Sequence, residues 1–339
     1  MLTCNISDIL LFLCSHDLSA QVIGKQPALK GRHVNERSIS SLTQIWHVAV
    51  HEILTLLRSR RVLAVLILYL IFAVLGSLGY VAALEQIEQQ MREVLLAGGT
   101  PPDQVSTTTS ILGSDAYKKI LAFFVGAKPD QLASVFLESP FVPVILGASL
   151  MLLPYLVLLL GYDLVITEVE SRSICYVALR ISRSTLILGK YLAHALIFCG
   201  LTAVCSIMLL LLAMRLSGVT DQITTATGLL RVWVSLIPYG LCYLGMIVLS
   251  STLVEKRRSA LTFAVVVLFV FQLMAWAHHL PNEGVWQWLQ YLRWLSPSTY
   301  TDGLWLAGVV EPLIHVGALT AFALLFTVAA IFRLNRRDL

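Results

Sequence analysis

The stretch VLAVLILYLIFAVLGSLGYVAAL, Val62–Leu84, contains no charged side chain and decides the fold class. A helix of roughly 20 apolar residues is long enough to cross a hydrocarbon core about 30 Å thick. A lone strand of the same residues would leave backbone N–H and C=O groups unpaired in lipid, so a helix is the expected state. The sequence therefore predicts that the chain crosses a membrane here.

The composition indicates that membrane character extends along the whole chain. Of the 339 residues, 57% are hydrophobic and only 13% are charged, and the mean hydropathy is +0.80. A soluble chain carries about a quarter charged residues. Five further stretches are long and apolar enough to be spans: 142–166, 189–214, 232–253, 259–279 and 312–332. We therefore expect an all-α polytopic membrane protein with six transmembrane helices.

The distribution of Lys and Arg predicts the orientation, because positive residues near span ends are retained on the cytoplasmic side. One set of alternate segments holds thirteen such residues: Arg58, Arg60, Arg61, Arg172, Arg180, Arg183, Lys190, Lys256, Arg257, Arg258, Arg333, Arg336 and Arg337. The opposite set holds seven: Arg92, Lys118, Lys119, Lys128, Arg215, Arg231 and Arg293. Both termini are therefore expected in the cytoplasm. The net charge of +4 and the short basic clusters do not favour a nucleic-acid partner.

The residues outside the spans divide into three regions. Residues 1–37 contain no stretch long enough to span a membrane, and we expect a weakly ordered cytoplasmic extension. Apolar residues then recur at helical spacing over 42–57, which predicts an amphipathic interfacial helix within 38–61. A cytosolic packing helix is the alternative. The transmembrane domain follows at 62–339, with a large outer loop at 85–140.

The most informative stretch is the expected cytoplasmic link between spans two and three, GYDLVITEVESRSICYVALRISRSTLILGK, Gly161–Lys190. Thr167 and Glu170 have the spacing of a capping box, in which each side chain caps the backbone N–H of the other residue. Glu168 adds negative charge at the start of such a helix, where the dipole favours it. We therefore expect a short coupling helix from Thr167 to about Leu179, lying across the membrane face. A solvated connector is the alternative.

This link resembles a sequence pattern of type-2 ABC exporter permeases. The residues that carry the resemblance are Asp163, Glu168, Ser173, Arg183 and the pair Gly189–Lys190, with Ser173 in place of the usual Thr. Arg172 stands where a Gly is common, and Arg180 where a Pro is usual. The six spans, the interfacial helix, the Ser296–Pro297 step and the basic C-terminal stretch also resemble that family. The resemblance covers residues 40–339.

The resemblance implies a permease subunit of an ATP-driven exporter in the bacterial inner membrane, which moves its substrate from the cytoplasm or the inner leaflet outward. It implies a second permease copy or a paralogue as partner, within the lipid bilayer. Two separate ATPase subunits, which carry ATP and Mg, would dock beneath the link. The residues of the ATPase-coupling segment would then be Asp163, Glu168, Glu170, Arg172, Arg180, Arg183 and Lys190.

The sequence itself carries no G-x-x-x-x-G-K-[ST] phosphate loop, because Gly189–Lys190 is followed by Tyr191. We therefore expect no cofactor in this chain and do not expect an enzyme. An intramembrane enzyme is the weaker alternative, since His194 and His315 each enter a span without a carboxylate or cysteine at the same depth. A membrane anchor of a motility or signalling assembly is the other alternative. No catalytic or metal site is expected, and the substrate cannot be identified from the sequence.

Overall fold

The computed structural model describes residues 41–97, 141–170, 181–216, 222–276, 289–305 and 310–336. All of them belong to one unit of the chain, Ser40–Leu339. The α-helices are α2 (Ser41–Arg58), α3 (Arg60–Ala97), α7 (Phe141–Gly161), α8 (Ile166–Glu170), α10 (Arg183–Leu216), α11 (Gln222–Leu253), α12 (Arg257–Trp276), α13 (Leu289–Leu292) and α14 (Val310–Asn335). Three 3-10 turns follow α13, at Arg293–Leu295, Pro297–Tyr300 and Asp302–Trp305. The described residues contain no strand, which confirms the expected all-α class.

Within the described residues, six helical stretches are long and apolar enough to cross a membrane, as expected. They are Arg60–Gly79, Ile145–Glu170, Arg183–Arg215, Gln222–Leu253, Arg257–Ala275 and Val310–Asn335. The first of these stretches ends at Gly79, five residues before the predicted Leu84, and α3 continues as a helix to Ala97. The added turns are rich in Glu, Gln, Met, Arg and Leu, which favour helices whether or not lipid surrounds them. The rest of the expected outer loop, like residues 1–37, lies outside the described residues.

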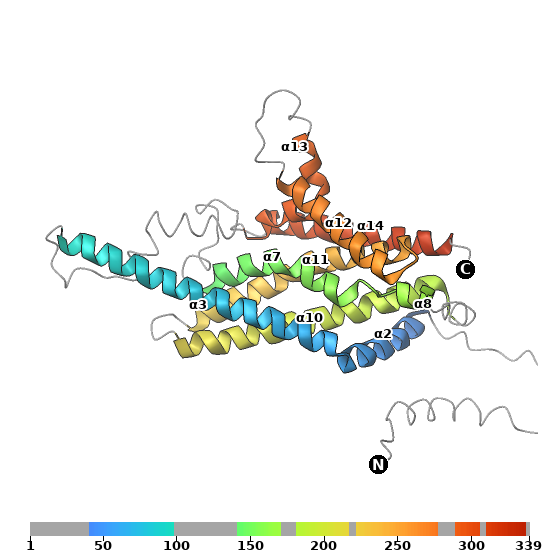
Figure 1. Cartoon of the computed structure of the whole chain (residues 1–339), viewed down its shortest axis with the longest axis horizontal. Helices are drawn as coiled ribbons and strands as arrows, with labels where there is room; N and C mark the ends of the chain where they lie inside the picture. The colour runs from blue at the N-terminus through green and yellow to red at the C-terminus, as the bar shows by residue number, and fades with distance from the viewer. Residues whose placement is uncertain are drawn as a thin grey trace, which may run out of the picture. The chain divides into compact units, whose positions relative to one another are not determined.

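Helix α11 lies at the centre of the bundle and packs against α14, α7 and α10 (Figure 1). Its Tyr239 and Tyr243 are fully buried, and their rings meet edge to face with centroids 4.9 Å apart. The Tyr239 hydroxyl donates to the Leu150 carbonyl of α7 at 3.3 Å. A Cβ at Gly245 would lie 2.9 Å from the Ala323 carbonyl oxygen of α14, so glycine allows the two backbones to approach. Such close approach stabilises helix pairs in lipid, where apolar side chains gain little from mutual burial.

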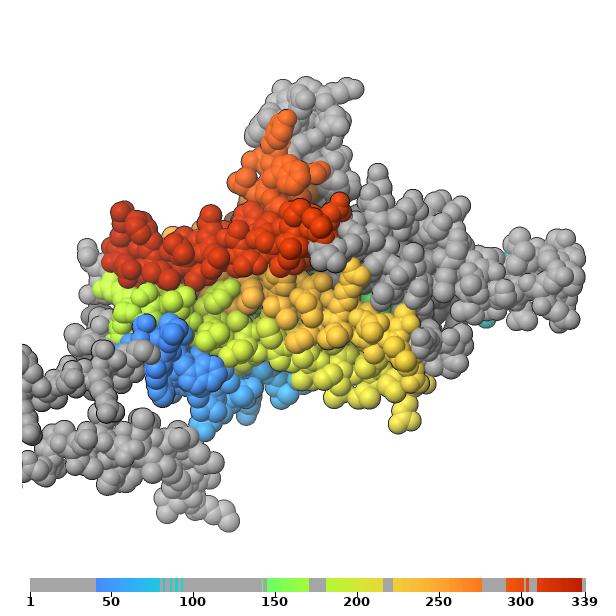
Figure 2. Space-filling model, turned by 180° about the vertical axis from the view of Figure 1, so that it is seen from behind, coloured from blue at the N-terminus to red at the C-terminus, as the bar shows by residue number. Residues whose placement is uncertain are grey.

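Two helices from the start of the chain cover one side of this core. Helix α2 packs across α10, and Figure 2 shows the blue surface of α2 against the yellow-green surface of α10. Helix α3 packs against α7 and also contacts α10. Large apolar side chains nevertheless stay exposed on the outer helices, for example Leu75, Phe269 and Leu324, each about 60% exposed. This is the surface that lipid solvates, since lipid tails are as apolar as these side chains.

The segment between α12 and α14 is compact and partly buried. Ser296 is fully buried, and its hydroxyl donates to the Phe271 carbonyl of α12 at 2.8 Å. Pro297 then begins a 3-10 turn, a position where its missing N–H costs nothing. The Ser296–Pro297 step therefore fixes this segment against α12 before the last span begins.

Candidate functional site

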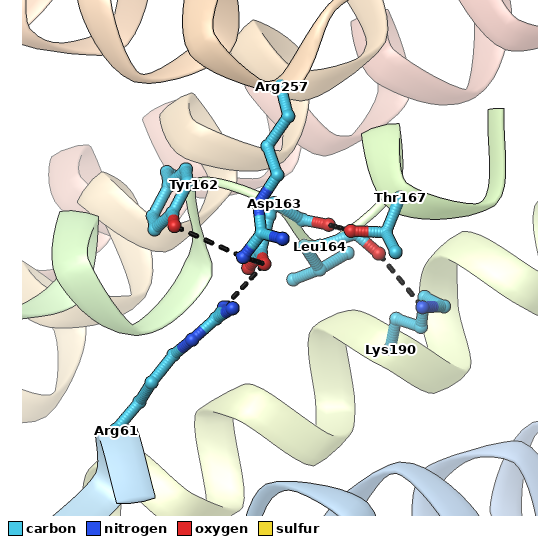
Figure 3. A network of polar contacts seen from close by, with 7 residues as sticks. All are labelled: Arg61, Tyr162, Asp163, Leu164, Thr167, Lys190 and Arg257. Atoms are coloured by element: carbon cyan, nitrogen blue, oxygen red, sulfur yellow. Dashed lines mark hydrogen bonds and ion pairs between the residues drawn. The ribbon is translucent and has the colours of Figure 1, made fainter. Parts of the chain in front are cut away.

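Asp163 follows α7 directly and joins three helices at one end of the bundle. Its carboxylate accepts hydrogen bonds from Arg61 at the start of α3 and, at 2.6 Å, from Arg257 at the start of α12 (Figure 3). The side chain of Asp163 is 15% exposed, against 45% for Arg61 and 37% for Arg257. We call these residues the Asp163 cluster. It links the start of the first and fifth spans to the end of the second.

Tyr162 completes the Asp163 cluster from the neighbouring position. The guanidinium carbons of Arg61 and Arg257 lie 5.8 and 5.5 Å from the centre of its ring, within the range of cation–π attraction. Arg257 also donates to the Tyr162 hydroxyl at 3.2 Å (Figure 3). The two guanidiniums repel each other. The Tyr162 ring adds its attraction to that of the Asp163 carboxylate and so helps to keep them together.

Lys190 forms a second cluster, about two turns into α10. Its ammonium lies 3.0 Å from Glu168 of α8 and 3.5 Å from Glu52 of α2, and it donates to the Leu164 carbonyl at 2.8 Å. The three donors of an ammonium thus meet three acceptors. Lys190 is only 5% exposed, which requires such pairing because a buried lone charge is costly. We call Lys190, Glu52 and Glu168 the Lys190 cluster.

Gly189 explains how α2 comes close enough to bring Glu52 to Lys190. A Cβ at this position would lie 2.7 Å from the Cβ of Val48 and 3.0 Å from the Ile45 carbonyl oxygen. A side chain would therefore force α2 away from α10. The two residues of the Gly-Lys pair act together. Gly189 allows α2 to approach α10, and Lys190 then forms an ion pair with Glu52 of α2.

The two clusters together are electrically neutral. Arg61, Arg257 and Lys190 supply three positive charges, and Asp163, Glu52 and Glu168 supply three negative ones. The backbone of residues 163–164 connects them, because the Asp163 side chain and the Leu164 carbonyl both take part (Figure 3). Helices α2, α3, α7, α8, α10 and α12 are therefore tied together at one end of the bundle.

Arg183 adds α14 to the same end. Its guanidinium donates to the Leu334 carbonyl at 2.9 Å and to the Asn335 carbonyl at 3.4 Å, both in the last turn of that helix. Carbonyls in a last helical turn have no partner within the helix and carry partial negative charge, so a cation there is favourable. Arg183 itself is the first residue of α10, whose N-terminus Ser182 caps by accepting from the Thr185 N–H at 3.2 Å.

The predicted capping box is wrong. Helix α8 begins at Ile166, so Thr167 lies inside it, and its hydroxyl donates back to the Asp163 carbonyl at 3.0 Å. The reason is that the turns after α7 keep nearly helical hydrogen bonds, such as that from the Thr167 N–H to the Asp163 carbonyl. The chain therefore needs no new cap. Glu170 is exposed at the end of α8.

The structure describes some of the other residues of the predicted coupling segment and not others. The structure brings Asp163, Glu168 and Lys190 into the two clusters and places Arg183 beside α14. Arg172 and Arg180 lie outside the described residues, and so does the expected continuation of the coupling helix to Leu179.

Sequence reasoning missed three charged residues of the two clusters. The sequence marks Arg61 and Arg257 only as cytoplasmic residues, and it assigns Glu52 no role. A signal was present for Glu52, because it lies on the same predicted helix face as Ile45 and Ala49, which is unusual for a carboxylate. Among the described residues, no group of three His, Cys, Asp or Glu side chains could hold a metal ion.

These observations define a class of protein: a multi-pass helical membrane protein whose helix ends are joined by charged side chains on one side. A comparison with protein families is more specific, since the model described as "ABC-2 family transporter protein" matches residues 46–339. The chain therefore belongs to the ABC-2 transporter family and is a membrane permease. No curated protein matched the sequence.

Proposed function

We propose that this permease is the membrane-spanning subunit of an ATP-driven exporter and that the two clusters receive the movement of a separate ATPase. The observation that carries the proposal is the buried Lys190 cluster, which joins α8 to α2 and α10. Helix α8 lies at the start of the link that the sequence pattern of the family marks as the coupling segment. A force on this link would therefore reach the spans through charged contacts as well as through the backbone.

The arrangement of the clusters supports transmission to several spans at once. Asp163 bonds to Arg61 and Arg257, which begin the first and fifth spans, and Lys190 lies in the third. Because α7 ends only four residues before α8 begins, a tilt of α8 also acts directly on the second span. ATP binding to the partner would shift the permease between two conformations in which these ends are placed differently.

The proposed assembly contains two ATPase subunits, which hold ATP and Mg, and a second permease copy or a paralogue. The end that carries both clusters faces the cytoplasm of a bacterial inner membrane, and both termini lie on that side. The positive residues Arg58, Lys256 and Arg336 near this end support the orientation, because such residues are retained in the cytoplasm. Transport runs outward.

The test is purification of the tagged chain in mild detergent from the cells that normally make it. We expect a separate protein with a phosphate loop to co-purify, and we expect the complex to hydrolyse ATP in nanodiscs. The charge reversal Glu168→Arg should retain the bound ATPase and its hydrolysis while abolishing the nucleotide-driven change of the spans. Glu311→Arg is the control, since Glu311 is exposed in the first turn of α14 and belongs to neither cluster. A chain that purifies without any ATPase would contradict the proposal and favour an anchor.

A further inference from the structure

An apolar groove lies on the surface between α2, α3 and α10. Its volume is about 330 Å³, and its lining includes Ile53 and Leu57 of α2, Val62 and Leu66 of α3, and Leu196 and Val204 of α10. Leu196 and Val204 are 42% and 41% exposed, so the groove is open along one side. None of these side chains is used by the coupling site.

The length of the groove fits a single hydrocarbon chain. From Leu196 to Val204, α10 rises about 12 Å, which is most of the roughly 15 Å depth of one bilayer leaflet. An extended acyl chain is one methylene wide and would contact all three helices.

The surface around the groove favours lipid as the occupant. Helix α2 exposes an apolar edge next to it that includes Trp46, Val50 and Leu54, which are 54%, 36% and 44% exposed. An exposed apolar edge on an amphipathic helix is buried among acyl chains when such a helix lies in the membrane interface. The groove therefore opens into the leaflet in which α2 lies.

Two arginines that adjoin lining residues in the sequence supply positive charge for a lipid headgroup. Arg58 follows the lining residue Leu57, and Arg60 precedes Val62 by two positions. Both side chains are exposed. Arginine binds phosphate through paired N–H donors, and basic residues at this depth attract anionic lipids.

We propose that this groove is a binding site for one anionic phospholipid, with an acyl chain between α2, α3 and α10 and the phosphate on Arg58 and Arg60. The bound lipid fills the angle between the interfacial helix and the first and third spans. It is a resident of the permease and not its cargo. The proposal requires only that the protein lies in a bilayer, so it does not depend on the exporter function.

Gly200 allows a sharp test. It belongs to the groove lining, and a Cβ there would meet nothing within 4 Å, so Gly200→Leu would fill the groove without displacing protein atoms at the Cβ. Gly317 of α14 is a matched control, because its Cβ would also meet nothing within 4 Å and it is exposed. Both changes replace glycine by leucine within a helix, so they alter helix propensity equally.

The experiment reconstitutes the full chain in phosphatidylcholine nanodiscs that contain a small fraction of a photoactivatable, clickable phosphatidylglycerol, and it maps the labelled peptides by mass spectrometry. We expect labelling to concentrate on the α2, α3 and α10 peptides that line the groove. Gly200→Leu should reduce it to the level of other lipid-facing helices, and Gly317→Leu should leave it unchanged. Uniform labelling, or labelling that Gly200→Leu does not reduce, would overturn the proposal.

The headgroup part is tested with Arg58→Gln and Arg60→Gln and with a photoactivatable phosphatidylcholine of the same chain. Each lost charge should lower the preference for phosphatidylglycerol by about fivefold, with little change in labelling by phosphatidylcholine. Equal labelling by the two lipids in the unchanged protein would contradict the assignment of the phosphate. A bifunctional cross-linker added to the same nanodiscs tests the other occupant: cross-links that join two copies of the chain through the groove peptides would show that a second copy, and not lipid, occupies the groove.

Discussion

The Asp163 cluster has two positive charges and one negative charge, and the Lys190 cluster has one positive charge and two negative charges. The two clusters also differ in how exposed their cations are. In the first, one carboxylate serves two guanidiniums that are 45% and 37% exposed. In the second, one lysine whose side chain is 7% exposed serves two carboxylates that are 18% and 23% exposed. Water therefore screens the cations of the first cluster more than the cation of the second, so the same number of ion pairs has different energies. We expect the Lys190 cluster to hold α8 more firmly than the Asp163 cluster holds its helices.

The largest expected effect is that of Lys190→Met. It leaves Glu52 and Glu168 facing each other without a cation, and breaking a buried ion pair in this way costs about 3 kcal/mol or more of the free energy of unfolding. Denaturant titration in detergent micelles measures this loss. The triple variant Lys190→Met, Glu52→Gln, Glu168→Gln should recover most of it, because no unpaired charge remains. If Lys190→Met were no worse than the triple variant, the cluster would not be buried as described.

Gly189→Ala should have the second largest effect, because it acts on the contact that brings Glu52 to Lys190. The added methyl would overlap Val48 of α2, and overpacking of this kind costs about 1–3 kcal/mol. Hydrogen exchange of α2 amides and the free energy of unfolding both measure it. Gly200→Ala in the same helix is the control, since its Cβ has open space, and it should be neutral or stabilising. Equal effects of the two changes would contradict a tight contact between α2 and α10.

Asp163→Asn should cost less, about 1 kcal/mol, because its partners are partly exposed. Its effect should also shrink when salt is raised, whereas that of Lys190→Met should change little, since salt screens exposed pairs more strongly than buried ones. Unfolding measured at low and high salt separates the two. The comparison would fail if both variants showed the same dependence on salt.

The smallest effect is expected for Tyr162→Leu, which removes the ring between the two arginines. A cation–π contact at an exposed site contributes about 0.5–1 kcal/mol. Tyr162→Phe keeps the ring and loses only the hydrogen bond from Arg257, so most of the stability should remain. Thermal unfolding of both variants in one detergent tests this order. A larger loss for Tyr162→Phe would mean that the hydroxyl, and not the ring, holds the arginines.

The number of spans was predictable from the sequence, because about 20 apolar residues in a row are a local property. The pattern also indicated Asp163, Glu168 and Lys190, and the structure brings each of them into a cluster. Their partners were not predictable, because Arg61 and Arg257 lie about 100 positions from Asp163 and have an independent explanation as cytoplasmic markers. A local sequence pattern does not show which distant helix end a basic residue will contact.

The capping box failed for a related reason. Thr167 and Glu170 have the right spacing, but spacing alone does not show whether the preceding turns have left the helix. The hydrogen bonds after α7 keep the chain close to helical geometry, so the Thr167 hydroxyl finds the Asp163 carbonyl instead of a free N–H. The sequence predicted the first span and not the full length of α3, because apolar character marks where a helix leaves the lipid and not where it ends.

The most direct test of the central claim, that α8 and α2 move as one body through Lys190, is a distance measurement by electron spin resonance. Spin labels at Thr167 of α8 and Leu54 of α2, both exposed, would be placed in a variant without native cysteines and assembled with the partner ATPase in nanodiscs. The account predicts that ATP leaves the distance between these labels unchanged, whereas the neutral triple variant shows a nucleotide-dependent change. A change of the same size with the intact Lys190 cluster would contradict it.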